Sequence, residues 1–361
     1  MTSTEVGIIS LIKSAIKSVS VALPSDFDWE EAKRIIHSHE IFGLIYYGLK
    51  NSHIDIPQWL EDKTLKRTAF LTRLNRAANT VMKSFDDEGI EYVPLKGLIT
   101  KDAYPQKIMR HMSDADILIH EKDYEKKIKP IMLKLGFTEG VESDHELHWS
   151  KEDLMIELHK RIIPSYNKDY YKVVGDGWEW IKEHDNFEYT FIHFAKHYRD
   201  AGVGIGHLVD LEVLWEEKDF SYIGLNEFRD NIRKTLDVWF HEGTSDEKTD
   251  LITTTVFESG EYGTSENRES SGDIKVLNSA KGNPFLANIK NKLRMLFIPY
   301  SSYKAAFPIL NKLPILLPVF FLWRIIRTPF RKSGRRNLAK VVKNQDEYAG
   351  KLAMVGLEYK F

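Results

Sequence analysis

The sequence predicts an α+β protein in which a small mixed β-sheet is flanked by N-terminal and C-terminal helical regions. Apolar residues recur at three- and four-residue spacings over residues 5–90 and again over 176–240, as on the buried side of helices. Between these regions, short apolar runs alternate with helical patterns, which is typical of a sheet covered by helices. Hydrophobic residues make up 42% of the 361, enough to bury the cores of about two or three domains.

The first predicted domain, residues 1–89, is helical. Its longest amphipathic stretches are WEEAKRIIHSHEIFGLIYYGLKN and LEDKTLKRTAFLTRLNRAANTVMKSFDDEG. Ser25 and Asp26 before the first stretch are a helix start signal, and Gly48 near its end is a stop signal. We expect this domain to pack on a core rather than to carry chemistry.

Residues 90–172 are the predicted α/β core. Its short strands are IEYVPL, DADILI, FTEG, HELHWS and LMIELHK. A short helix with a break at Pro105 follows the first strand, and a helix over residues 120–136 follows the second. In LMIELHK, Leu and Ile alternate with Met155, Glu157 and His159, so the two sets are expected on opposite faces of the sheet.

Residues 173–284 are predicted as a helical region that ends in a long polar loop with one short helix, and residues 285–361 as a basic helical segment. From Ile274 to Gln345 there are 15 Lys and Arg and no Asp or Glu. Because the whole chain carries −2 and the last sixteen residues −1, residues 1–273 sum to −16. A basic block on an acidic body implies an anionic partner.

Phospholipid head groups, nucleic acid or the acidic body itself are the candidate partners of this block. The uncharged run from Leu313 to Trp323 holds two prolines and is too short to span a bilayer. Residues 285–343 form either two helices on the core or a segment that contacts an anionic membrane surface. Nucleic acid is disfavoured because the remaining basic residues form no stripe for a template.

The chain has no cysteine, which excludes disulfides and thiolate metal sites and favours a reducing, cytoplasmic location. The first residues lack a basic start and a continuous apolar run, so we expect no secretory signal. The resulting expectation is a cytoplasmic protein, with peripheral membrane contact as the alternative.

Asp114 and Asp116 are separated by one residue in the second strand, so both carboxylates are expected on one face. Such a pair repels itself unless a cation lies between, which predicts a site for Mg²⁺ or Mn²⁺. A third acidic ligand is needed for two metal ions, and Glu157 in the same sheet is the best candidate. Its rivals, at turns or strand ends, are Asp144, Glu146 and Asp153.

Lys96 and Gly97 follow the first strand and are expected to hold phosphate groups. Glycine lets the backbone approach phosphate oxygens, the next helix presents free N–H groups, and the lysine adds a point charge. Arg110, four residues before Asp114, is expected to clamp a phosphate with two hydrogen bonds. Ser113 is a further candidate for nucleotide contact.

His193 and His197 lie four residues apart on a predicted helix, with Asp210 further along. This spacing suits Zn²⁺, but the glutamate of H-E-x-x-H is absent because the chain reads HFAKH. Packing, or contact with a nucleotide or acceptor, are the other interpretations.

His145, His148 and His159 are expected to gather beside the sheet in a structural or substrate-orienting role. No P-loop, G-x-S-x-G or G-x-G-x-x-G motif is present, so those phosphate and acyl chemistries have no support.

The order of strand, Lys-Gly, helix, R-x-x-x-D-x-D strand, helix and Glu-Leu-His strand resembles the uncharacterised bacterial nucleotidyltransferases of the polymerase-β-like superfamily. The matching pieces are YVPLKGLIT, RHMSDADILI, the helix that ends in KLGF, and MIELHK. The resemblance implies that Gly97 matches the superfamily's first glycine, Asp114 and Asp116 its metal pair, and Glu157 its third acid. Leu98 stands where the usual serine contacts a phosphate.

The residues and the resemblance predict a Mg²⁺- or Mn²⁺-dependent nucleotidyltransferase. It would move NMP from an NTP, such as ATP, to a hydroxyl or phosphate of an unknown small-molecule, sugar or protein acceptor and release pyrophosphate. The alternative is a nucleotide-binding scaffold without turnover that docks on a membrane or a polysaccharide-assembly complex through its basic C-terminal segment. Leu98 in place of serine favours the alternative.

Overall fold

The computed structural model describes residues 1–120, 122, 124–261, 263–268, 270–271, 307–311, 313–327 and 338–358. The chain divides into two compact units, one formed by Met1–Thr264 with residues 355–358 and the other within Ser265–Met354. The predicted boundaries at 89/90 and 172/173 both fall inside the first unit. Residues 272–306 and 328–337, with most of the predicted basic block and much of segment 285–343, lie outside the described residues.

The second unit is helical where it is described. It contains two short 3₁₀ turns, η4 and η5, and the helices α16 and α17; their bounds are Pro308–Asn311, Pro314–Leu316, Leu317–Arg327 and Leu338–Met354. In the described part of the chain, no helix has the length and apolar content needed to cross a bilayer.

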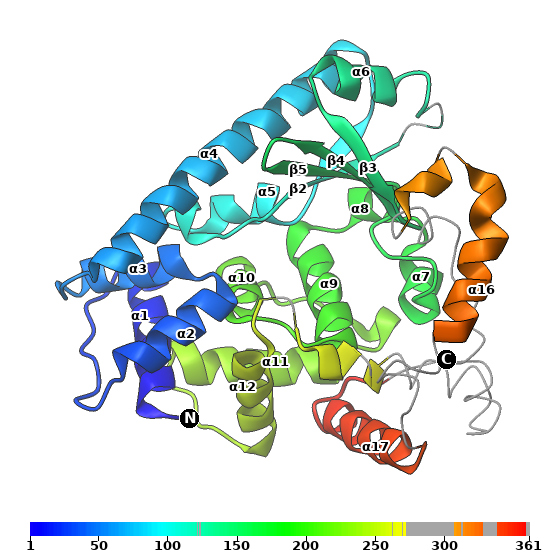
Figure 1. Ribbon diagram of the computed structural model, residues 1–361. Helices are drawn as coiled ribbons and strands as arrows, with labels where there is room; N and C mark the ends of the chain where they lie inside the picture. Colours follow the sequence, from blue (N-terminus) through cyan, green and yellow to red (C-terminus); the bar gives the residue numbers. More distant parts are fainter. Residues whose placement is uncertain are drawn as a thin grey trace. The chain divides into compact units, whose positions relative to one another are not determined.

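The first unit is built around one five-stranded sheet with the order β1-β2-β5-β4-β3 (Figure 1). β2 pairs in parallel with β5, and the other three pairings are antiparallel, so the sheet is mixed as predicted. The last strand along the chain therefore lies in the middle of the sheet. The strand bounds are Tyr92–Pro94, Ala115–Ile119, Thr138–Glu142, Glu146–Lys151 and Leu154–His159.

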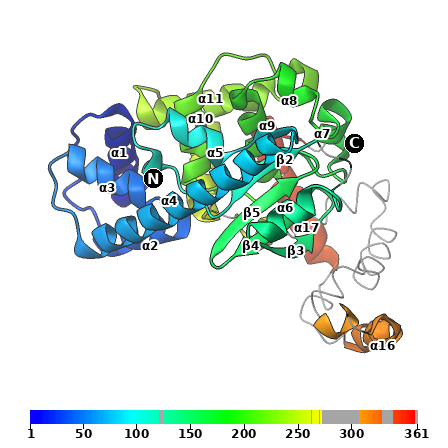
Figure 2. The same ribbon diagram turned by 90° about the horizontal axis from the view of Figure 1, so that it is seen from above.

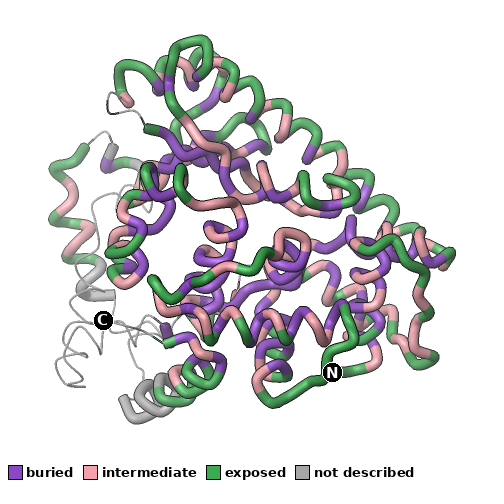
Figure 3. Tube along the Cα trace, turned by 180° about the vertical axis from the view of Figure 1, so that it is seen from behind, coloured by how far each residue is buried: buried purple, intermediate pink, exposed green. Residues whose placement is uncertain are grey.

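Helices lie on both sides of this sheet, which confirms the α+β class. Helix α4 (Gln58–Asp87) crosses one face, as the view from above shows (Figure 2). Its buried side, together with α6 (Ile128–Lys134), packs on strand residues such as Ile117 and Ile156 to form an apolar core. The outer side of α4 is exposed along its length (Figure 3). Helix α9 (Asn186–Asp200) lies on the opposite side of the sheet (Figure 1).

The N-terminal helices of the first unit confirm the helical prediction but correct its signals. They are α1 (Ser3–Lys17), α2 (Trp29–His39) and α3 (Phe42–Asn51). Asp28, rather than Ser25 or Asp26, caps α2, because its side chain accepts hydrogen bonds from two N–H groups of the first turn. Gly48 lies inside α3, where a Cβ atom would collide with the carbonyl of Leu11. This glycine therefore allows α1 and α3 to pack closely and is not a stop signal.

Two predicted helices of the α/β core are shorter than expected. The segment after β1 is broken into α5 and two 3₁₀ turns, Gly97–Thr100, Lys101–Ala103 and Lys107–Met109. Among the described residues of the helix predicted over 120–136, regular helix is found in α6 alone. Pro130 stands in the first turn of α6, where a missing N–H is tolerated.

The remaining helices complete the first unit. The region predicted as a polar loop with one helix contains α12, which a capping box of Asp246 and Thr249 begins. The bounds of α7, α8, α10, α11 and α12 are Lys168–Val174, Trp180–Glu183, Ile205–Leu214, Asn226–Phe240 and Glu247–Ser259.

Candidate active site

Strand alternation gives the sheet one apolar and one polar face. In register across three strands, Ala115, Ile156 and Trp149 form an apolar row that packs in the core under α4. One residue along each strand, Asp116 pairs with Glu157, and Glu157 pairs with His148. We call this second set the polar row. Glu146 and His159, which are paired with each other, follow on the same face because each lies two residues from a member of the row.

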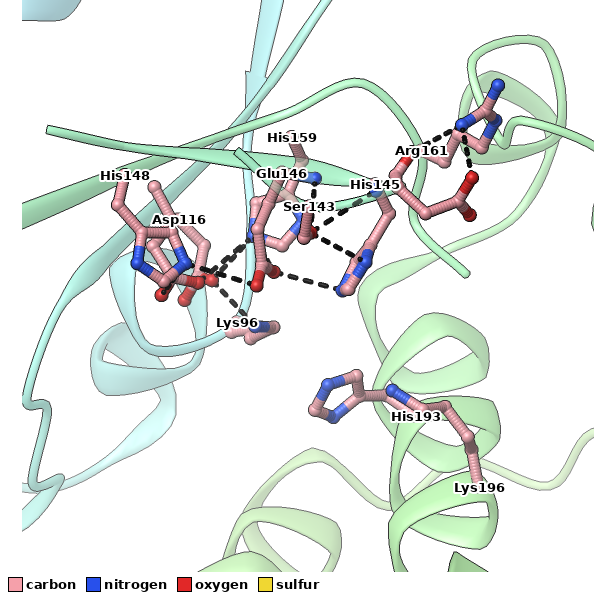
Figure 4. A network of polar contacts seen from close by, with 12 residues as sticks. Lys96, Asp116, Ser143, His145, Glu146, His148, His159, Arg161, His193 and Lys196 are labelled. Carbon is pink, nitrogen blue, oxygen red and sulfur yellow. Dashed lines mark hydrogen bonds and ion pairs between the residues drawn. The ribbon is translucent and has the colours of Figure 1, made fainter. Parts of the chain in front are cut away.

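Asp116 is buried and accepts two hydrogen bonds at one oxygen. Lys96 Nζ lies 2.6 Å and His159 Nε2 lies 2.8 Å from Asp116 Oδ1 (Figure 4). Burial alone would raise the pKa of Asp116, but Lys96 and His159 hold that pKa well below its usual range. Burial likewise would lower the pKa of Lys96, whereas the charge of Asp116 raises it. Both groups are therefore charged at neutral pH.

Lys96 occupies a strained position in the turn after β1. Its φ of 47° and ψ of −127° lie in a region that costs a non-glycine residue about 1–3 kcal/mol. The turn is fixed on both sides, since Leu95 N–H donates to the carbonyl of Asp116 and Thr100 N–H donates to the carbonyl of Lys96. The fold thus holds the ammonium group next to Asp116 at a local energetic cost.

Asp114 differs from Asp116 although the two were expected to act as a pair. It precedes β2 rather than lying in it, and its carboxyl is partly buried. Burial, and then the charge of Asp116, raise the pKa of Asp114 to about 7, with Lys96 opposing the shift. A carboxyl with this pKa is protonated in about half of the molecules at neutral pH unless a cation lies beside it.

Two groups of metal-ligand atoms stand out among the described residues. One is Asp116, Glu157 and His159, and the other is Glu146, His148 and Glu157; within each, the donor atoms lie within 4.8 Å of one another. Glu157 belongs to both, and Asp114 to neither. The structure thus brings Asp116 and Glu157 together as predicted, and Asp114 lies near enough to them for their charges to raise its pKa.

The three histidines predicted to gather beside the sheet do so around Glu146. His145 Nε2 lies 2.9 Å from Glu146 Oε2, and His148 Nε2 lies 3.2 Å from Glu146 Oε1. His148 Nε2 also lies 3.3 Å from Glu157 Oε1, and His159 Nε2 lies 3.6 Å from Glu157 Oε2. Figure 4 shows this network above Lys96.

The residues predicted at or near the phosphate site differ in their surroundings. Gly97 is buried, and a Cβ atom there would collide with the side chain of Met112. The absence of a side chain at Gly97 therefore makes room for Met112. Leu98 is only 6% exposed and belongs to the apolar core with α4. The residue that replaces the usual serine therefore serves packing, and its presence leaves the carboxylates of the polar face in place. Ser113 is half-buried next to Asp114.

Arg110 is held by a partner that the sequence did not suggest. Its Nε lies 2.7 Å from Asp210 Oδ1, and Tyr104 donates a hydrogen bond of 2.6 Å to the same oxygen. The guanidinium also donates to the carbonyl of His111. This pairing anchors the connector before β2 to helix α10 and gives Asp210 a structural role.

Helix α9 faces the polar row with Tyr189, His193 and His197, spaced by one helical turn each. His193 Nε2 and His197 Nε2 are 3.0 Å apart, and Figure 4 shows His193 below Lys96 and Glu146. Burial, followed by neighbouring positive groups that include Lys96, lowers the pKa of both histidines well below the usual value. The helix therefore presents neutral hydrogen-bonding groups to the charged face. Neither histidine belongs to a metal-ligand group among the described residues.

The sequence reasoning missed Glu146 with His148 as a donor pair, and Tyr189 as a neighbour of the carboxylates. The signal for the first was present, because E-x-H in HELHWS has the same spacing as D-x-D and the E-x-H of LMIELHK. No local signal identified Tyr189. Burial raises the pKa of Tyr189, and the charges of Asp116, Glu146 and Glu157 add to the shift.

A comparison of the sequence with models of protein families found a match. The model of the family described as "Uncharacterised nucleotidyltransferase" matches residues 25–228. The match covers more than half of the chain, and it includes every strand of the sheet and helix α9. Searches of curated proteins and of solved structures gave no match.

Proposed function

The chain belongs to this family of uncharacterised nucleotidyltransferases, and on that premise we propose that it transfers NMP from an NTP to a hydroxyl or phosphate of a small molecule, sugar or protein and releases pyrophosphate. The observation that supports this proposal best is the pair Asp116 and Glu157, two carboxylates in register on neighbouring parallel strands. Lys96 stands beside them as a cation for phosphate groups. Nucleotidyl transfer needs charges of this kind more than it needs a covalent nucleophile.

The residues fit a divalent cation such as Mg²⁺ or Mn²⁺. Asp114, Asp116 and Glu157 bring three carboxyl groups near one another, and burial, followed by the charges of Asp116 and Glu157, raises the pKa of Asp114. Carboxylate oxygens are the ligands that these ions prefer. We propose that Asp114, Asp116 and Glu157 hold the metal. A bound ion would supply charge neutralisation at the phosphate oxygens.

The chain's own groups have separate tasks in this proposal. Lys96 would bind a phosphate oxygen of the NTP, and His159 would keep Asp116 oriented through its hydrogen bond. Glu157 would accept the proton of the acceptor hydroxyl while the oxygen of that hydroxyl forms a bond to the α-phosphorus. The bond from that phosphorus to the bridging oxygen breaks, and pyrophosphate leaves. Positioning of the two substrates supplies the remaining rate enhancement.

The neutral histidines of α9 are suited to contact the nucleotide or acceptor. Their pKa values are lowered, so at neutral pH His193 and His197 form hydrogen bonds without adding positive charge. We propose that Gly97, Arg110 and Ser113 shape the nucleotide side of the site, with Arg110 acting by holding the connector before β2 on Asp210.

The test uses the full chain with each α-labelled NTP in turn, in Mg²⁺ or Mn²⁺, followed by mass analysis of the protein and of candidate small-molecule acceptors. We expect pyrophosphate release together with a product heavier by one NMP. The double variant Asp114→Asn with Asp116→Asn serves as the control and should release none. Transfer that continues unchanged in the double variant, or its absence with every NTP and acceptor class, would overturn the proposal.

A further inference from the structure

We propose that Glu146, His148 and Glu157 form a second cation site, which prefers a divalent transition metal such as Mn²⁺ or Zn²⁺ to Mg²⁺. The site shares Glu157 with the proposed metal ligands Asp116 and Asp114. Its part in catalysis rests on the proposed function, whereas its ability to bind metal does not. This proposal replaces the structural or substrate-orienting role expected for His148.

The backbone places the three donors together. His148 and Glu157 are direct partners across the antiparallel pairing of β4 and β5, and Glu146 lies two residues before His148 on the same face. His148 Nε2 lies 3.2 Å from Glu146 Oε1 and 3.3 Å from Glu157 Oε1. Ligand atoms at ordinary zinc bond lengths in a tetrahedron stand about 3.3 Å from one another. The nitrogen of His148 therefore already has this spacing to both carboxylates, and all three donor atoms lie within 4.8 Å of one another.

The hydrogen bonds distinguish His148 from its two neighbours. His159 points Nε2 at Asp116, while its buried Nδ1 finds no hydrogen-bond partner among the described residues. A histidine in that state carries its proton on Nε2 and orients Asp116. His145 contacts Ser143 with Nδ1 and Glu146 with Nε2, so it orients Glu146. Such supporting contacts to ligating carboxylates are usual around metal sites.

His148 instead directs a single nitrogen between two carboxylates. Its side chain is 31% exposed, whereas that of His159 is 2% exposed, so an ion can reach His148 from solvent. In the described part of the chain, the ion pairs of Glu146 and Glu157 are with histidines, and Lys96 pairs with Asp116. A metal ion bound beside His148 would add a positive charge next to both glutamates.

The ligand set decides the metal class. Mg²⁺ takes oxygen ligands in strict octahedral geometry, whereas an imidazole nitrogen favours Zn²⁺ and other transition metals, and carboxylates also suit Mn²⁺. Glu157 presents one oxygen to His148 and the other towards His159, beside Asp116. Glu157 could therefore be a ligand both of an ion at His148 and of an ion at Asp116.

The test measures Mn²⁺, Zn²⁺ and Mg²⁺ binding to the metal-free full chain by equilibrium dialysis and calorimetry, without nucleotide. We expect two Mn²⁺ or Zn²⁺ ions per chain in the parent. His148→Ala should lose one of them, with affinity at that site falling by at least tenfold, and should keep its Mg²⁺ binding. His148→Gln, which preserves size, should behave in the same way. Circular dichroism confirms that each variant is folded.

A matched control is His120→Ala, which removes a half-exposed histidine of the same unit that pairs with Glu91. Its metal stoichiometry should equal that of the parent. Asp116→Asn should remove the other ion, and Glu157→Gln should weaken both. In Mn²⁺ the parent should show an exchange-coupled paramagnetic resonance signal that disappears in His148→Ala.

Unchanged Mn²⁺ and Zn²⁺ binding in both His148 variants would overturn the second site, and so would Mg²⁺ filling both sites equally well. These outcomes are separate from the fate of the proposed function. A chain that binds two transition-metal ions but transfers no nucleotide keeps the second site and loses the function. A chain that transfers nucleotide but binds the same number of metal ions without His148 keeps the proposed function and loses the second site.

Discussion

The two faces of one sheet carry opposite chemistry in neighbouring residues. On strands β2, β5 and β4, the apolar row of Ala115, Ile156 and Trp149 packs under α4. The polar row of Asp116, Glu157 and His148 lies one residue further on, facing α9. Both rows lie on the same three strands, so the difference in chemistry between them comes from the side chains.

This difference separates stability from function. Burying a side chain such as Ile156 stabilises the fold by about 1.5–3 kcal/mol relative to exposure. Burying carboxylates together costs free energy, as the raised pKa of Asp114 and the dependence of Asp116 on Lys96 show. The apolar row therefore holds the sheet together, and the polar row is suited to bind cations. Four experiments test this contrast.

The largest effect is expected at Asp116. Asp116→Asn removes the charge that pairs with Lys96 and that we propose binds the metal, so NMP transfer should fall by about 10³-fold or more, equivalent to about 4 kcal/mol. Initial rates at saturating NTP measure the loss. The matched control is Asp102→Asn, which breaks an exposed pair with Lys107 and should stay within about threefold of the parent rate. A rate for Asp116→Asn within tenfold of the parent would contradict the division between the faces.

The next test compares two adjacent residues of β5. Ile156 is fully buried in the core, so Ile156→Ala should lower the free energy of unfolding by about 2–5 kcal/mol. Glu157→Gln keeps the shape of the side chain and removes a negative charge from a crowded face, so it should change that free energy by less than about 1 kcal/mol. Urea unfolding without metal measures both. Equal losses would show that the two faces do not differ as we infer.

Leu98 sharpens the comparison, because it stands at a position where a polar residue was expected. Leu98→Ser places a hydroxyl in the apolar core and should destabilise the fold by about 2–4 kcal/mol. It should not increase NTP affinity, since the side chain does not belong to the polar face. Leu98→Met, which conserves volume, should cost less than about 1.5 kcal/mol. Tighter NTP binding by the serine variant, measured by calorimetry, would count against this placement.

The smallest effect concerns a buried carboxylate outside both rows. Burial raises the pKa of Glu261 to about 7, although Arg110 opposes the shift. The folded protein thus binds this proton more tightly than the unfolded chain. The resulting stability is complete below pH 4.5, the ordinary pKa, and is lost as the pH rises through 7. Relative to the parent, Glu261→Gln should therefore gain about 1–3 kcal/mol between pH 4.5 and pH 8.

Urea unfolding at the two pH values measures this gain. The exposed Glu258 of the preceding helix offers the matched control, Glu258→Gln. If the stability difference between Glu261→Gln and the parent is the same at both pH values, burial of this carboxyl carries no cost.

The strands and the ligands within them could be predicted from sequence because alternation along a strand is a local property. The five predicted strands correspond to β1 to β5. Their order in space did not follow from the sequence, since the pairing of β2 with β5 joins residues that are distant in sequence. For the same reason the spacing of Glu146 and His148 was visible while their approach to Glu157 was not.

The assignments that needed revision involve partners supplied by remote helices. Arg110 was expected to clamp a phosphate, but Asp210 of α10 pairs with it. Leu98 was compared with a phosphate-binding serine, but it packs in the apolar core between α4 and the sheet. Gly48 was interpreted as a stop signal, while its role depends on the approach of α1. In each case tertiary packing, which no local pattern records, decides the role.

The central position of β5 also has a consequence for folding. The sheet is complete only when β5 is paired with both β2 and β4, so the approach of Asp116 to Glu157 depends on a contact between residues that are distant in sequence. Contacts of such long sequence separation form slowly, because the loop must close before they contribute. A metal ion that bridges these strands would bind the native state and not the unfolded chain. It would therefore slow the opening of the sheet and make the protein's lifetime depend on metal concentration.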